Sequence, residues 1–284
     1  MQIGVMMHCT DVTITPAELA VAAEERGFES MFVTEHTHIP VRQFIEWWGG
    51  QPMPEEYKRL HDPIVALATA GAVTSRIKLG TGVLVLGQRE PLATAKQLAS
   101  LDRLTGGRLI CGVGYGWERD ELAHHGIAWA ERRAAWREHV QAVRVLWTDD
   151  EAAFAGNRVR FAPSWSYPKP LQPAGPPMLL GAVGSDANLH DVVEYVDGWM
   201  PVEGTEAIGE RWTRLQRLAL EAGRSPATLQ LTIYGSSGSE ELLTEYEHWG
   251  ATRVVIGIAG SNQSEVAAQL DRHTPLVDRF ASSP

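Results

Sequence analysis

The sequence has few cysteines, no long apolar run and no excess of positive charge, and each shortage argues against a class of protein. Cys9 and Cys111 are the only cysteines, and their separation fits neither a disulfide framework nor a paired metal motif. No apolar run approaches the roughly 18 residues of a membrane span, and no secretory leader is evident. The net charge of −10 argues against nucleic acid or an anionic membrane as the main partner. We therefore expect a cytoplasmic protein with two buried free thiols.

Segments with strand and helix signals alternate along all 284 residues. The strand segments are short continuous apolar runs, as is typical of parallel strands in a sheet covered by helices. A long irregular segment, 35–61, follows the second strand, and a small hairpin at 152–161 follows the fourth. Eight strand–helix units predict one (β/α)8 TIM barrel domain over 1–284. The expected strands are 2–7, 30–34, 77–85, 108–113, 178–181, 198–202, 229–234 and 253–258, and the last helix is expected at 263–273.

A barrel of this kind builds its site from residues at the carboxyl ends of the strands. The most distinctive such segment is Gly112-Val113-Gly114-Tyr115-Gly116-Trp117, after the fourth strand. Alternating glycines let a ligand approach closely, but they equally ease tight packing at a barrel corner, and both explanations stay open. They do not form the dinucleotide fingerprint, Gly-x-Gly-x-x-Gly with a later acidic residue. The strand-end rule selects His8, Glu35, His36, His38, Gly82, Val83, Gly114, Gly116, Trp117, Gly181, Gly184 and Ser185.

The segment Gly181-Ala182-Val183-Gly184-Ser185-Asp186 connects the fifth strand to a helix. Free N–H groups at a helix start, together with the helix dipole, favour an anion there. Ser185 or Asp186 also fits a plain helix cap, and the two interpretations are compatible.

A histidine pair, His36 and His38, follows the second strand and raises the question of a metal site. Barrel hydrolases that use such a pair take further His and Asp ligands from later strands. The fifth, sixth and eighth strands end at 180–182, 200–202 and 256–258 without such ligands, so we expect no metal. His124 and His125 are expected in an exposed loop, whereas His8 either faces the pocket or is a satisfied strand-end histidine.

The segment 41–61 is rich in aromatic side chains and too long for a simple connection. Trp47 and Trp48 favour a binding loop over an apolar or planar substrate. Packing against a neighbouring subunit is the alternative.

These motifs, in this order, resemble the bacterial luciferase-like family of flavin- and deazaflavin-dependent oxidoreductases. The chain is most similar to the branch that uses coenzyme F420, a deazaflavin that carries hydride. The resemblance covers nearly the whole chain and lies in residues 33–36, 76–84, 91–99, 101–108, 112–117, 176–181, 197–201 and 222–226.

The resemblance implies coenzyme F420, or alternatively FMN, at the barrel mouth, with a non-prolyl cis peptide at Gly82–Val83 backing its ring. It places the cofactor phosphate near 181–185. The implied cofactor contacts are Glu35, Gly82, Val83, Gly114, Gly116, Trp117, Gly181, Ala182, Gly184 and Ser185.

The implied reaction is hydride transfer between F420 and a weakly polar organic substrate. His36 is the expected proton donor or acceptor. The alternative is that His36 only packs against the cofactor ring or forms a hydrogen bond with Glu35. His8, His38, Trp47 and Trp48 are expected to line the substrate pocket. Trp117 stands where an F420-dependent sugar-phosphate dehydrogenase has a glutamate, which argues against a sugar phosphate.

The family tends to form dimers, so a homodimer is expected. The main alternative is an FMN-dependent monooxygenase that uses reduced flavin and oxygen. A catalytically silent flavin-binding protein and a metal-dependent barrel hydrolase are the remaining ones.

Overall fold

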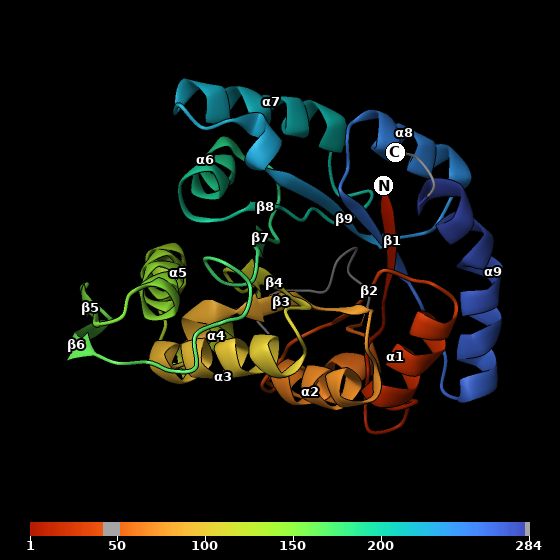
Figure 1. Ribbon diagram of the computed structural model, residues 1–284, viewed down its shortest axis with the longest axis horizontal. Coiled ribbons are helices and arrows are strands. Elements are labelled where there is room, and N and C mark those ends of the chain that lie inside the picture. Colours follow the sequence, from red (N-terminus) through yellow and green to blue (C-terminus); the bar gives the residue numbers. More distant parts are fainter. Residues whose placement is uncertain (42–51, 282–284) are drawn as a thin grey trace.

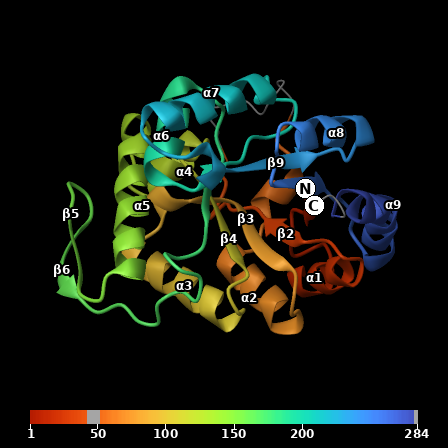
Figure 2. The same ribbon diagram turned by 45° about the horizontal axis from the view of Figure 1, so that its top comes forward.

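A computed structural model describes residues 1–41 and 52–281 and shows a closed parallel barrel surrounded by helices (Figure 1; Figure 2). The strands are hydrogen-bonded in the order β1-β10-β9-β8-β7-β4-β3-β2, which confirms the predicted fold. Their bounds are β1 Gln2–Met6, β2 Ser30–Val33, β3 Lys78–Val85, β4 Leu109–Gly114, β7 Met178–Leu180, β8 Gly198–Trp199, β9 Gln230–Ser236 and β10 Arg253–Gly257. The helices are α1 Pro16–Glu25, α2 Pro63–Val73, α3 Pro91–Leu104, α4 Arg119–His124, α5 Arg132–Thr148, α6 Asp186–Tyr195, α7 Ile208–Glu221, α8 Glu240–His248 and α9 Gln263–Ala281.

The first three long helices begin where the sequence supplies a cap followed by proline. Thr15 and Glu18 form a reciprocal capping box at α1, and Asp62 accepts two backbone N–H bonds at α2. Glu90 caps α3 in the same way. Proline at the first helical position does not need the N–H that it lacks, so each start is fixed locally.

The predicted hairpin is also present, as β5 Ala152–Ala155 and β6 Arg160–Ser164. It lies outside α5, away from the barrel strands, in both views (Figure 1; Figure 2). It therefore adds nothing to the barrel wall.

Three expectations about boundaries were wrong. The last helix continues past His273 and through Pro275 to Ala281, because Leu276, Val277 and Phe280 are buried there against the core. The sixth barrel strand, expected at 198–202, has only two residues. His124 lies in the last turn of α4 rather than in a loop.

Side chains fill the inside of the barrel, so a ligand can enter only at its mouth. The inner cluster consists of Met6, Phe32, Ile110, Leu179, Met200 and Val255, with Val83 and Tyr234 packed on it. Cys9 and Cys111 are buried free thiols, as predicted, and burial raises the pKa of Cys9 to about 12. In the part of the chain that the structure describes, no helix combines the length and apolarity needed to cross a membrane.

Candidate functional site

His36 follows β2 at the barrel mouth and is paired with a carboxylate from a different part of the chain. Its Nδ1 lies 2.7 Å from Oε2 of Glu121 on α4, and both side chains are buried. The backbone N–H of Thr37 donates to the other oxygen, Oε1, at 2.7 Å. Burial alone would raise the pKa of Glu121, but the bonds from His36 and Thr37 hold it below its ordinary value. The imidazole of His36 is thus paired with the ionised carboxylate of Glu121, and not with Glu35.

Aromatic rings surround His36. Trp117, after β4, meets it edge-on with ring centroids 5.3 Å apart, and Tyr57 lies at 5.6 Å. His8 packs on Tyr57 at 4.8 Å and lies 3.7 Å from the Glu56 carboxylate. Burial lowers the pKa of His8, although Glu56 opposes this effect, and burial raises the pKa of Tyr57 to about 12. The mouth is therefore lined by rings that are uncharged near neutral pH.

The Gly82–Val83 peptide is cis, which confirms the geometry implied by the resemblance. The pairing of β3 with β4 shifts register between Thr81 and Leu84, so a bulge lies at this bond. A Cβ on Gly82 would lie 2.4 Å from the ring of Tyr234. Because that distance is far below van der Waals contact, the packing of Tyr234 requires glycine at position 82.

Val83 projects from the bulge between two glycines of neighbouring strand ends. A Cβ on Gly114 would lie 2.7 Å from Val83 Cγ2, and one on Gly181 would lie 2.5 Å from Val83 Cγ1. Gly116 has a φ of +86° and packs against Val85 and Leu122. These contacts favour the packing explanation for Gly114 and Gly116, and Gly114 and Gly181 hold Val83 in place at the mouth.

The side chain of Glu35 is buried, and its hydrogen-bond partners belong to the protein. Its carboxylate accepts from Arg89 Nε at 2.6 Å and from the Val85 backbone N–H at 2.6 Å, and its side chain is 1% exposed. Arg89 also bonds Asp62 at 2.7 Å, the residue that caps α2. The Glu35 carboxylate therefore fixes the backbone after β3, and a direct contact with the cofactor stays a prediction.

The turn after β7 holds an anion, but that anion belongs to the protein. The N–H of Gly184 donates to both oxygens of Glu206, at 2.8 and 2.7 Å. Ser185 caps α6 by accepting from the Asn188 N–H at 3.3 Å, and the carbonyl of Ala182 accepts from Trp199. A carboxylate seated on Gly184 shows that this N–H is aimed at negative charge, which fits a phosphate.

The structure does not place the remaining expected pocket residues, His38, Trp47 and Trp48, beside His36 and the bulge of β3. His38 is exposed and turns toward α4, with its Nε2 2.8 Å from His124 Nδ1. Trp47 and Trp48 lie outside the described residues.

Sequence reasoning missed Glu121, Arg89 and Glu206, and it included Tyr57 only as one aromatic residue of the segment 41–61. Glu121 lies 85 positions from His36, and nothing local distinguishes it from the other acidic residues at the start of α4. The aromatic composition of the segment 41–61, to which Tyr57 belongs, was the one signal that pointed to it.

A family model described as luciferase-like monooxygenase matches residues 15–273, and the chain belongs to this family. An uncharacterised protein of Mycobacterium tuberculosis is 38% identical over 275 residues, covering 96% of this chain and 97% of that protein. An F420-dependent glucose-6-phosphate dehydrogenase of Nakamurella multipartita is 33% identical over 175 residues, covering 60% of this chain and 47% of that enzyme. An FMNH2-dependent dimethylsulfone monooxygenase of Pseudomonas putida is 32% identical over 195 residues, covering 68% and 49%. Relatives thus use either cofactor.

Two solved structures share the fold over nearly their whole length. A monooxygenase of Streptomyces bottropensis has a TM-score of 0.79 at 20% identity, covering 99% of this chain and 100% of that one. An F420-dependent secondary alcohol dehydrogenase, solved with an F420–acetone adduct, has a TM-score of 0.76 at 18% identity, covering 97% and 98%. At such identities the likeness concerns the barrel.

Proposed function

We propose that the chain is an F420-dependent oxidoreductase that transfers hydride to or from a weakly polar organic substrate at the barrel mouth. The observation that carries the proposal is the buried His36–Glu121 pair beside the Gly82–Val83 bulge. Val33 of β2 is paired with Thr81 of β3, so the segments that follow both residues emerge side by side at the mouth. A proton-transfer group and a ring platform therefore meet at one edge of the barrel.

The residues present fit a tricyclic ring and a phosphate. Val83, supported from behind by Gly114 and Gly181, offers an apolar surface to a planar ring. Gly184 offers a backbone N–H that already donates to a carboxylate, that of Glu206. When bound, the deazaflavin would supply a carbon that gives or takes hydride, while the protein would orient it and exclude water.

His36 supplies the accompanying proton transfer. Because Glu121 holds Nδ1, the ring orientation is fixed and Nε2 is the nitrogen that exchanges a proton with substrate. A protonated His36 donates as a carbonyl is reduced, and a neutral one accepts as an alcohol is oxidised. The carboxylate of Glu121 stabilises the protonated ring in either direction.

The uncharged rings of Tyr57 and Trp117 support a weakly polar substrate. A sugar phosphate would bring charge to a lining that offers it aromatic rings. A homodimer and a cytoplasmic location stay predictions.

The second candidate is an FMN-dependent monooxygenase, favoured by the similarity to the dimethylsulfone enzyme. The two candidate reactions differ in whether they require molecular oxygen. Mixing the protein with reduced F420 and a panel of ketones and enones without oxygen should oxidise the cofactor and reduce one compound. Turnover that requires oxygen and reduced FMN, with none of the anaerobic reaction, would overturn the proposal.

A further inference from the structure

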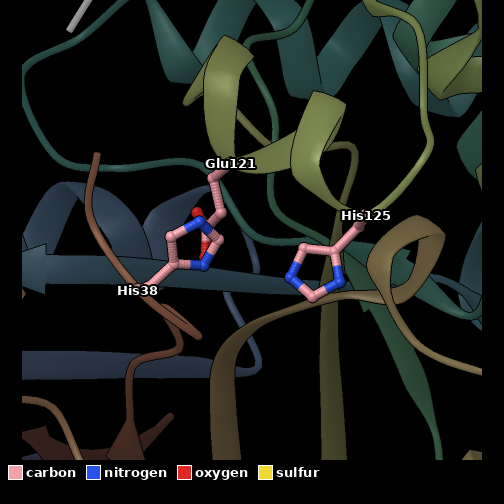
Figure 3. Close-up of side chains that lie close together, drawn as sticks. All are labelled: His38, Glu121 and His125. Carbon is pink, nitrogen blue, oxygen red and sulfur yellow. The ribbon is translucent and has the colours of Figure 1, made fainter. Parts of the chain in front are cut away.

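A second group of side chains lies beside the proton-transfer pair, between the segment after β2 and helix α4. His38, Glu121 and His125 each offer one donor atom, and these atoms lie within 4.8 Å of one another. Figure 3 shows Glu121 and His125 reaching from α4 and its C-cap toward His38. The ligands that strand ends could not provide come here from a loop and a helix.

The outer atoms of His38 and Glu121 already have partners, which leaves their inner atoms directed toward His125. His38 Nε2 lies 2.8 Å from His124 Nδ1, and Glu121 Oε2 lies 2.7 Å from His36 Nδ1. Metal-binding histidines and carboxylates are usually held in this way by a further shell of hydrogen bonds.

The three inner atoms surround one hydroxyl. Thr37 Oγ1 lies 2.7 Å from His125 Nε2, 3.0 Å from His38 Nδ1 and 3.0 Å from Glu121 Oε1. The hydroxyl has one proton, so it can donate to only one of these atoms. A rotation about χ1 would remove it from the centre, while the Thr37 backbone N–H would keep its bond to Glu121.

We propose that His38, Glu121 and His125 bind a divalent transition metal of the Zn²⁺ class in place of the Thr37 hydroxyl. Two imidazole nitrogens and one carboxylate oxygen are a donor set that suits zinc, with water as a fourth ligand. Bonds of about 2 Å place tetrahedral ligand atoms roughly 3.3 Å apart, so the two exposed histidines must close in slightly. Both lie at the surface, where such a rotation meets little resistance.

The metal would link residues 37–38 to α4, segments more than 80 positions apart in the chain. It would also fix the carboxylate that orients His36. This inference does not depend on the cofactor, because binding is measured with the metal alone.

The test is calorimetric titration of Zn²⁺ into the full chain after treatment with a chelator. We expect one site per chain with micromolar or tighter affinity, and a higher melting temperature with Zn²⁺. His38→Ala and His125→Ala should each weaken binding at least tenfold. His190→Ala, an exposed histidine on α6, is the matched control and should bind as the parent does.

Circular dichroism of each variant establishes that it is folded before it is titrated. Co²⁺ provides a second readout, because its visible absorption reports tetrahedral nitrogen and oxygen ligands. Equal Zn²⁺ affinity in the parent, His38→Ala and His125→Ala proteins would overturn the proposal, as would absence of binding at millimolar Zn²⁺.

Discussion

At the scale of single residues, the proposed proton transfer depends on the contact between His36 and Glu121. Replacing His36 with alanine removes the proton donor or acceptor but leaves Val83 and Gly184 in place. General acid–base catalysis contributes about 10²–10⁴ in rate, so His36→Ala should lower turnover by that order. Cofactor affinity should stay within a few-fold. Single-turnover hydride transfer, measured beside a binding titration, checks both; a parallel loss of binding and turnover would make His36 a packing residue.

Glu121→Gln tests the partner of His36 in the same experiment. Glutamine keeps an oxygen for the imidazole but removes the charge that favours its protonated form. We expect kcat to fall by about tenfold, with KM and cofactor affinity unchanged. A kcat equal to that of the parent would mean that Glu121 is structural.

At the scale of elements, glycines at the ends of β4 and β7 hold the bulge of β3. Gly181→Ala would place a methyl group 2.5 Å from Val83 Cγ1, so Val83 must move. Overpacking of this kind costs about 1–3 kcal/mol. Gly87→Ala is the matched control, because its methyl group would lie 3.8 Å from Ala135 in ordinary contact. Cofactor titration and thermal melts should show a loss of affinity and stability in the first variant and little change in the second.

In the turn between β7 and α6, we expect a substitution that strengthens cofactor binding instead of weakening it. The Glu206 carboxylate occupies the Gly184 N–H, so an incoming phosphate must displace it. Glu206→Ala should therefore tighten cofactor binding several-fold, whereas Ser185→Asp, which adds charge beside the same N–H, should weaken it. Glu210→Ala, on the exposed side of α7, serves as the control. Unchanged affinity in both variants would place the phosphate elsewhere.

At the scale of the whole molecule, an ion pair at the opposite end of the barrel sets acid stability. Glu29, before β2, accepts bonds of 2.6 and 2.7 Å from the buried Arg253 and lies 2.9 Å from Lys78. Burial alone would raise the pKa of Glu29, but these cations lower it to about 2. A carboxyl with a lowered folded-state pKa stabilises the protein above its unfolded pKa of about 4.3, and the contribution disappears as the pH falls through about 2.

Glu29→Gln should therefore lower the free energy of unfolding by roughly 2–3 kcal/mol at neutral pH, and the difference from the parent should narrow below about pH 4. Denaturant unfolding across pH measures it. Glu55→Gln, which breaks an exposed pair with Lys58, should change little at any pH. A gap that stays constant down to pH 2 would contradict this explanation.

The sequence predicted the barrel because its signals are local: caps such as Thr15 and Asp62, and apolar runs one strand long. It placed His36 and Val83 at the mouth by the same rule. It could not pair His36 with Glu121, or Gly184 with Glu206, because each partner comes from another strand–helix unit. It also could not decide between ligand approach and packing for Gly114, since the close position of Val83 is a feature of the folded barrel alone.

The most direct test of the central claim is a fluorescence titration of the purified protein with F420 and, in parallel, with FMN. We expect micromolar or tighter F420 binding and clearly weaker FMN binding, with Glu206→Ala strengthening the binding of F420. FMN binding as tight as or tighter than F420 binding would contradict it and favour the oxygen-dependent alternative.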